Sequence, residues 1–370
     1  MSSTSIAVIG GGIAGVTTAF HLARRGAHVT LVDDGGSGQA TAASAGIIAP
    51  WVSSSDGSYY EAYAAGGNFY PEFLSQLEEL GIRELGYRRS GALMVSADAA
   101  DLDAVEERIT RRVQDAGPVA GTVERADERR VHELLPALAP GLTGLFVSGG
   151  GRVDGRLLRD ATLTGALALG ARHVPDSALG LERARTGWRI RTTAGNLDAD
   201  VVVVAAGARV TALLEPLGVH VGISAQRGQL VHLGLRGVDT SPWPTVHPFA
   251  EHYLTPFDGG RIVVGATRES GSGFDPRVTA EGQLQVLRNA LELAPGLATA
   301  TVLEARAGIR PVADRGVPLI GRVPGADGLW MISGYGAGGL TMGPLFGDAV
   351  ARDVLGEPAP DLAAFAVTRG

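Results

Sequence analysis

The sequence contains no cysteine and no lysine, so all 32 residues counted as Lys or Arg are arginine. The absence of cysteine excludes disulfides, iron–sulfur clusters, thiolate catalysis and a flavin attached through a cysteinyl bond. The absence of lysine excludes Schiff-base chemistry and any mechanism in which a lysine ammonium activates oxygen.

A basic block and a long apolar run are also missing. The formal net charge of −7 argues against nucleic acid or an anionic membrane surface as a partner. The longest apolar candidate, residues 201–208, is too short to span a membrane and is typical of a buried strand. The first residues carry no basic segment before an apolar strand begins, so we expect no signal peptide and a soluble, cytoplasmic protein.

What is present begins with residues 6–33, IAVIGGGIAGVTTAFHLARRGAHVTLVD, which predict a strand, a glycine-rich turn, a helix and a second strand ending in an acid. Gly10 allows a tight turn, Gly12 lets backbone N–H groups approach a pyrophosphate, and Gly15 lets the helix pack close to the strand. Asp33 has the spacing of a carboxylate that binds ribose hydroxyls, which disfavours NADP. The unit predicts dinucleotide binding but does not separate FAD from NAD.

The rest of the chain alternates between two kinds of pattern. With 370 residues it has room for two domains, or for one with a large insertion. Residues 201–204 predict a strand of a parallel sheet buried on both faces, whereas residues 226–265 predict an antiparallel sheet. Residues 57–80, 101–116, 155–169 and 280–293 predict helices. We therefore expect an α/β fold whose two domains are interleaved in the sequence, with the ligand between them.

Seven blocks, in order, resemble the D-amino-acid oxidase family of flavoproteins over nearly the whole chain. They are IAVIGGGIAG, TAASAGIIAP, DADVVVVAAGA, QRGQL, HYLTP with GGRIVVGAT, AGIRPVADRGVPLIGR, and SGYGAGGLTMGP. The resemblance is closest to the glycine oxidase and D-amino-acid dehydrogenase branch. It implies a Rossmann-like FAD-binding domain (1–85, 145–220 and 305–370) interleaved with an antiparallel substrate-binding domain (86–144 and 221–304).

The resemblance implies non-covalent FAD, with Asp33 on the adenosine ribose and Val174 offering backbone groups to the adenine. A helix N-terminus at residues 338–341 would stabilise negative charge on the reduced flavin. The implied cofactor-binding residues are Gly10, Gly12, Ile13, Ala14, Gly15, Asp33, Asp34, Thr41, Ser44, Ala45, Gly46, Ile47, Val174, Ala206, Gly207, Gly338, Gly339, Leu340 and Thr341. We expect no metal site.

For the substrate, Arg310 matches the family's arginine that binds the amino-acid carboxylate, and Tyr253 matches the tyrosine that supports the same carboxylate. The alternatives are an ion-paired surface arginine and an aromatic that only fills a sheet face. Arg268 departs from the glycine oxidase branch, which has methionine there, and Ala337 stands where arginine is usual. Arg268 is then either a second anion-binding group or a solvated arginine paired with Glu269.

Four further residues are candidates for lining the site, although in such strands they are more often packed or exposed than catalytic. They are Trp51, Tyr335, His247 and His252.

The resemblance implies oxidation of the C–N bond of glycine, an N-substituted glycine or a D-amino acid, by hydride transfer from the α-carbon to flavin N5. The resulting imine hydrolyses to a 2-oxo acid or glyoxylate, and oxygen or another acceptor reoxidises the flavin. One alternative is a 2-hydroxy-acid oxidase, in which His247 or His252 would serve as the base. Another is a flavin-binding protein without turnover. A homo-oligomer is possible.

Overall fold

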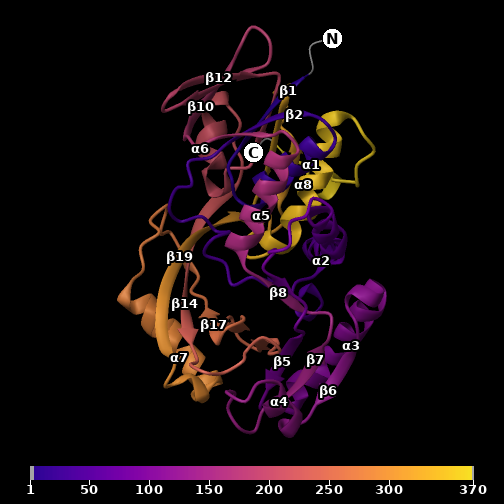
Figure 1. Ribbon diagram of the computed structural model, residues 1–370, viewed down its shortest axis with the longest axis vertical. Coiled ribbons are helices and arrows are strands. Elements are labelled where there is room, and N and C mark those ends of the chain that lie inside the picture. The colour runs from indigo at the N-terminus through magenta and orange to yellow at the C-terminus, as the bar shows by residue number, and fades with distance from the viewer. Residues whose placement is uncertain (1–3, 369–370) are drawn as a thin grey trace.

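A parallel sheet forms the upper half of the molecule in the computed structural model, which describes residues 4–368 (Figure 1). Its strand order is β20-β21-β13-β1-β2-β9, and every neighbouring pair is parallel except β20 with β21. The strands are β1 (Ser5–Ile9), β2 (His28–Val32), β9 (Arg172–Val174), β13 (Val201–Val204), β20 (Leu319–Arg322) and β21 (Leu329–Ser333). Three segments distant in the sequence therefore build one sheet.

Both faces of this sheet are covered, which explains the unbroken apolar run of β13. Ile6 and Val8 of β1 point into a core shared with the helices, whereas Ala7 and Ile9 point into a second core on the other face. The helices of the first face are α1 (Ile13–Arg24), α2 (Gly57–Glu78), α5 (Gly155–Ala168) and α8 (Gly339–Leu355). The second face is covered by β10 (Ala178–Arg183), β11 (Trp188–Thr192), β12 (Gly195–Ala199) and α6 (Val210–Leu214).

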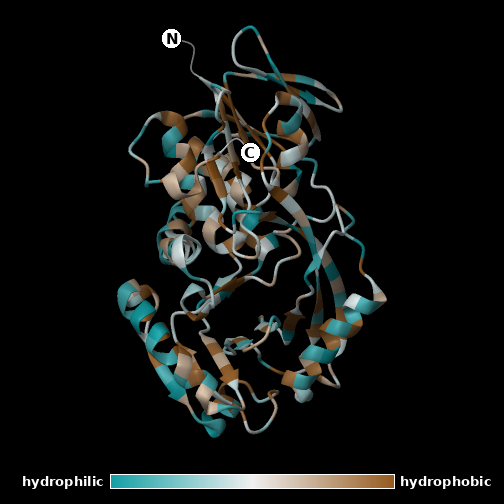
Figure 2. Cartoon of the chain, turned by 180° about the vertical axis from the view of Figure 1, so that it is seen from behind, coloured by the Kyte–Doolittle hydropathy of each residue, from teal (hydrophilic) through white to brown (hydrophobic). Residues whose placement is uncertain are grey.

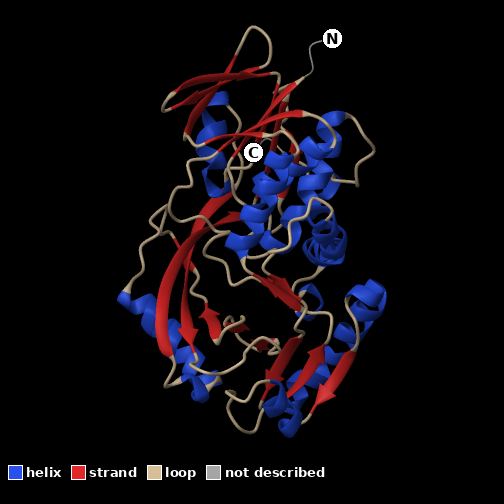
Figure 3. Cartoon of the chain, in the orientation of Figure 1, coloured by secondary structure: helices blue, strands red, loops and turns tan. Residues whose placement is uncertain are grey.

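The lower half contains a nine-stranded, largely antiparallel sheet with helices on its outer side (Figure 3). Its order is β18-β14-β17-β16-β15-β5-β7-β6, and β19 also pairs with β14. The strands are β5 (Ala92–Ser96), β6 (Val123–Ala126), β7 (Thr143–Val147), β14 (Ile223–Gly234), β15 (Thr245–Pro248), β16 (Tyr253–Pro256), β17 (Arg261–Gly265), β18 (Glu269–Ser270) and β19 (Thr301–Ala313). The outer helices are α3 (Ala99–Ala116), α4 (Glu128–Leu134) and α7 (Ala280–Leu293). Hydrophilic residues mark the outward surface of α3 (Figure 2).

Short elements complete the fold. A small sheet joins β3 (Ile47–Ile48), β8 (Gly151–Val153) and β4 (Tyr87–Arg88). Single 3-10 turns occupy Pro50–Val52, Gly117–Val119, Gly207–Arg209, Glu215–Leu217, Pro295–Leu297 and Ala363–Phe365. Among residues 4–368, no helix is both long and apolar enough to cross a membrane.

The predicted α/β class is confirmed, and the expected helices agree with α2, α3, α5 and α7. Helix α3 starts two residues before the predicted 101, because the carboxylate of Asp98 accepts a hydrogen bond from the Ala100 N–H at 2.9 Å and caps the helix. The predicted domain boundaries at 145 and 305 fall within β7 and β19, and the division into domains stays a proposal.

The long strands β14 and β19 extend from the lower sheet towards the upper one (Figure 1). They pair from Ile223 with Ala313 to Gly234 with Thr301. Near its C-terminal end β19 also forms single bridges from Ile309 to Gln39 and from Val312 to Tyr335. These bridges hold β19 against loops that follow the parallel strands, which positions the site described next.

Candidate active site

The loops that follow β1, β13 and β21 lie at one edge of the parallel sheet, because these three strands are parallel neighbours. Each of these loops contains predicted cofactor-binding residues. In open parallel sheets ligands bind at the carboxyl ends of the strands. The structure therefore brings together three glycine-rich segments that are far apart in the sequence.

The turn after β1 packs so closely that side chains at Gly10 and Gly15 would clash with the backbone. Gly10 has a φ of +107°, and a Cβ there would lie 2.4 Å from the carbonyl oxygen of Ala205. A Cβ on Gly15 would lie 1.8 Å from the Gly10 carbonyl oxygen. Gly12 precedes α1 without a side-chain cap, and the first turn of α1 has no acidic residue. This helix N-terminus suits the pyrophosphate of FAD.

The N-terminus of α8 has the same character. Gly338 precedes the helix without a side-chain cap, and its first turn has no acidic residue. The backbone there is held in place, since Tyr70 donates to the Leu340 carbonyl at 2.6 Å and Tyr59 donates to the Tyr335 carbonyl at 3.0 Å. The predicted segment 338–341 thus presents an uncapped helix end, which fits an anionic ring edge.

The segment 41–47 lies against both of these helix ends. The Thr41 hydroxyl accepts from the Ile13 N–H at 3.0 Å, and the Thr341 hydroxyl donates to the Ile47 carbonyl at 3.3 Å. Ser44 donates to the Thr41 carbonyl at 3.1 Å. The predicted residues of this segment are therefore next to those of α1 and α8, as a single cofactor requires.

Asp33 ends β2, as expected, and has a partner that the sequence reasoning missed. Arg159 of α5 donates to the Asp33 carboxylate at 3.2 Å and to the Gly11 carbonyl at 2.9 Å. Asp34 is bound by Ser177, and this hydrogen bond is the main cause that lowers the pKa of Asp34. The Val174 carbonyl accepts from the Asp33 N–H at 3.1 Å, so β9 lies beside the predicted ribose site.

Ala206 and Gly207 follow β13, where Gly207 begins a 3-10 turn, and Ser333 of β21 donates to the Gly207 carbonyl at 2.8 Å. Ala45 is buried in a cluster with Leu230, Phe257 and Val263. Gly46 has a φ of +78° and lies against the backbone of Val153.

Arg310 and Tyr253 meet although they lie in different strands, β19 and β16. The two side chains lie close enough for each to affect the pKa of the other. Burial lowers the pKa of Arg310 and raises the pKa of Tyr253, and in each case the partner opposes the shift. A buried guanidinium with few acceptors is suited to bind an anion. The structure therefore brings the two predicted carboxylate-binding residues together.

Gly228 of β14 makes room for the guanidinium. A Cβ at this position would lie 2.3 Å from Nη2 and 2.5 Å from Nη1 of Arg310. The guanidinium also donates to the Thr267 carbonyl at 3.0 Å, and Gln226 lies within 3.4 Å. Gln226 and Gly228 belong to the QRGQL block, whose link to Arg310 the sequence reasoning missed. Gln226 and Gly228 are two residues apart and therefore point to the same face of β14, which pairs with the AGIRP segment of β19. This spacing could have indicated that both lie near Arg310.

Arg268 lies near this pair and is half exposed. Its charge lowers the pKa of both Tyr253 and Arg310, although burial and the mutual contact have larger effects. Its ion pair is with Glu251, at 3.4 Å from Nε to Oε2. The expected pairing of Arg268 with Glu269 is wrong, because Glu269 binds Arg227 instead. Neighbouring residues of extended backbone point in opposite directions, which separates the side chains of 268 and 269.

The other candidates differ in their surroundings. Trp51 is buried in a core with α3 and β5, and Tyr335 is buried with its ring centroid 6.1 Å from that of Phe346. Burial lowers the pKa of His247 to about 4, and its Nε2 lies 2.9 Å from the Thr245 hydroxyl. Burial also lowers the pKa of the half-buried His252.

Comparison with known proteins agrees with this geometry. Residues 5–352 match the family model DAO, FAD dependent oxidoreductase. An uncharacterized oxidoreductase of Bacillus subtilis, YurR, is 41% identical over 355 residues, covering 95% of each chain. Glycine oxidase of Pseudomonas putida is 30% identical, covering 97% of this chain and 98% of its own.

Among solved structures, iminodiacetate oxidase (IdaA) from Chelativorans sp. BNC1 is 43% identical, with a TM-score of 0.94 over 98% of this chain and 99% of its own. The glycine turn before α1 and the N-terminus of α8, whose N-cap residue is a glycine, fit the cofactor that the family uses, and without cysteine the flavin has no cysteinyl linkage. The chain belongs to the DAO family of FAD-dependent oxidoreductases.

Proposed function

We propose that the protein oxidises the C–N bond of a small amino acid that carries two carboxylates, with an N-carboxymethyl amino acid such as iminodiacetate as the substrate class. The observation that carries this proposal is the presence of two guanidinium groups, since Arg268 lies close enough to Arg310 for its charge to lower the pKa of Arg310. The similarity to iminodiacetate oxidase supports it. Plain glycine would leave the second guanidinium without an anion.

Arg310 and Tyr253 bind the α-carboxylate, and Tyr253 donates its hydroxyl hydrogen because burial keeps the phenol protonated. Arg268 binds the second carboxylate, for which it leaves the exposed Glu251. With both ends held, the methylene between carboxylate and nitrogen has a fixed orientation. This is the main contribution that we assign to the side chains.

FAD, when bound, supplies the oxidising group that accepts a hydride from this carbon. The substrate amine must be neutral before the hydride leaves, so its proton goes to solvent. The carbon loses two electrons, and the imine then hydrolyses to glyoxylate and the remaining primary amine, which is glycine for iminodiacetate. The electron acceptor that reoxidises the flavin, oxygen or another, and a cytoplasmic location stay predictions.

The test is the visible spectrum of the purified holoprotein without oxygen, before and after adding iminodiacetate, N-methylglycine, glycine, D- and L-aspartate or 2-hydroxy acids. We expect iminodiacetate to bleach the flavin at the lowest concentration. Equal bleaching by N-methylglycine would contradict the role of two carboxylates. Bleaching by hydroxy acids alone would favour a 2-hydroxy-acid oxidase, and a flavin that no compound reduces would favour a binding protein.

A further inference from the structure

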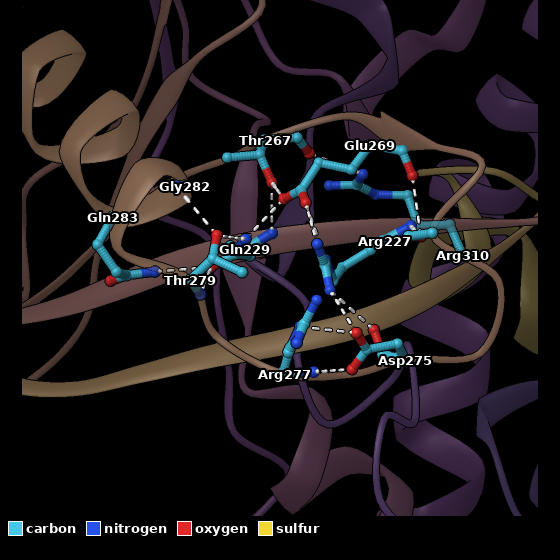
Figure 4. Close-up of polar contacts among 11 residues, drawn as sticks. Arg227, Gln229, Thr267, Glu269, Asp275, Arg277, Thr279, Gly282, Gln283 and Arg310 are labelled. Atoms are coloured by element: carbon cyan, nitrogen blue, oxygen red, sulfur yellow. Dashed lines mark hydrogen bonds and ion pairs between the residues drawn. The ribbon is translucent and has the colours of Figure 1, made fainter.

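A buried polar network lies beside Arg310, and Glu269 is at its centre (Figure 4). One Glu269 oxygen accepts from Arg227 at 2.8 Å (Nε) and 2.6 Å (Nη2). The other accepts from Gln229 Nε2 at 2.7 Å and from the Thr267 hydroxyl at 2.5 Å. Four donors therefore occupy the acceptor positions of one carboxylate, which leaves it a single orientation.

Gln229 connects this carboxylate to helix α7. Its amide nitrogen also donates to the Thr279 hydroxyl at 2.9 Å, and its amide oxygen accepts from the Thr279 N–H at 2.8 Å. Thr279 caps α7 by accepting from the Gly282 N–H at 3.2 Å. Gln229 is fully buried, so each of these bonds is shielded from water.

Thr267 connects the same carboxylate to Arg310. Its hydroxyl donates to Glu269 and accepts from the Gln229 N–H at 2.9 Å, and its own N–H donates to the Gln229 carbonyl at 3.1 Å. The side chain is 1% exposed. The Thr267 carbonyl then accepts from Nη1 of Arg310 at 3.0 Å. Glu269 thus holds the residue whose carbonyl orients the carboxylate-binding guanidinium.

We propose that Glu269 is a positioning residue that acts on Arg310 through Thr267. The inference rests on the proposed function only in assigning carboxylate binding to Arg310, and it does not depend on a second carboxylate. Glu269→Gln keeps the shape and removes the charge. A glutamine amide has one acceptor oxygen, which the charged Arg227 guanidinium keeps as its partner. The NH2 group then faces Gln229 and the Thr267 hydroxyl, which both donated to the carboxylate. Thr267, and with it Arg310, then shifts.

The experiment titrates oxidised holoenzyme with acetate, a single carboxylate, and follows the visible absorption of the flavin. We expect Glu269→Gln to raise the Kd of acetate about tenfold, the effect of misplacing a binding group by a fraction of an ångström. In a Thr267→Val background the same substitution is expected to change the Kd less than about threefold, because the connecting hydroxyl is already gone. If Glu269→Gln raises the Kd of acetate by the same factor with and without Thr267→Val, the two residues act independently, which would contradict action through Thr267.

Asp275→Asn is the matched control. Asp275 accepts from Arg227 Nη1 at 3.2 Å and pairs with Arg277 at 2.8 Å. Its hydrogen bonds within residues 4–368 do not include one to Thr267. We expect less than about a twofold change in Kd, as for a partly exposed charge pair. Weakening equal to that of Glu269→Gln would assign Glu269 a merely structural role and overturn the proposal.

Two further outcomes separate this inference from the proposed function. If iminodiacetate does not reduce wild-type flavin while acetate shows the expected pattern, the substrate proposal is wrong and the role of Glu269 stands. If acetate does not bind the wild-type protein, there is no carboxylate site to position and the inference is wrong. If Glu269→Gln does not retain FAD, Thr267→Val alone is expected to weaken acetate binding several-fold, and unchanged binding would overturn the proposal.

Discussion

The proposed function assigns the recognition of a second carboxylate to Arg268, and Arg268→Gln tests this directly. A hydrogen bond to a charged group contributes roughly 1.5–3 kcal/mol. Because the Arg268 side chain is 49% exposed, water screens the contact and the lower end of that range applies. Leaving Glu251, which is 78% exposed, costs less than about 1 kcal/mol. The expected loss is about 0.5–1.5 kcal/mol, or roughly two- to tenfold in kcat/KM for iminodiacetate.

The assay is a ratio, which removes effects on folding or flavin content. Anaerobic stopped-flow reduction gives kcat/KM for iminodiacetate and for N-methylglycine with the wild-type protein and with Arg268→Gln. We expect kcat/KM for iminodiacetate relative to N-methylglycine to fall roughly two- to tenfold, with the value for N-methylglycine nearly unchanged. Glu251→Gln, the matched control, removes only the competing partner and is expected to leave the ratio equal or slightly higher. A parallel loss for both substrates would refute the assignment of Arg268 to the second carboxylate.

Three other results are expected. Gly228→Ala should displace the Arg310 guanidinium, since the new Cβ would lie 2.3 Å from it. We expect the Kd of acetate to rise about a hundredfold while thermal stability changes little. An unchanged Kd would count against the packing described. The pH profile of kcat/KM should rise through one ionisation whose midpoint follows the substrate amine, because burial lowers the pKa of His247 to about 4 and keeps this imidazole neutral; a midpoint common to substrates of different basicity would disprove this. Burial lowers the pKa of His21 from 6.5 to about 3, so below pH 6.5 this side chain takes up a proton in the unfolded chain but not in the folded protein. The free energy of unfolding should therefore be about 2 kcal/mol lower at pH 5 than at pH 7. In urea titrations, His21→Phe should lose less stability between these two pH values.

The parallel sheet was predictable because local patterns determine it. The glycine spacing after β1 and the four valines of β13 each have one simple structural interpretation, and the structure agrees with both. The outer helices followed from their apolar periodicity. The positions that depended on a resemblance, such as Arg310 and Tyr253, were reached because each lies within a distinctive block of sequence.

The network around Arg310 was not predictable in the same way. Arg227 and Glu269 are 42 residues apart and meet only because β14 pairs with β18. The sequence placed Glu269 next to Arg268, and nearness along the chain suggested the wrong partner. In a strand the side chains of consecutive residues point to opposite faces, whereas strand pairing brings together residues that are far apart in the sequence. Arg159, which binds Asp33 from α5, is a second example.

The order of strands in the upper sheet has a consequence for biosynthesis. The ribosome delivers β1 and its glycine turn first. The strand that pairs with β1, β13, comes about 200 residues later, and β21, which pairs with β13, comes about 320 residues later. A nascent chain therefore contains the glycine turn after β1 long before the loops after β13 and β21, which complete the predicted cofactor site, have been synthesised. Because FAD stabilises the state that binds it, by mass action, and the predicted site includes the loop after β21, we expect tight flavin binding only after this strand has been inserted.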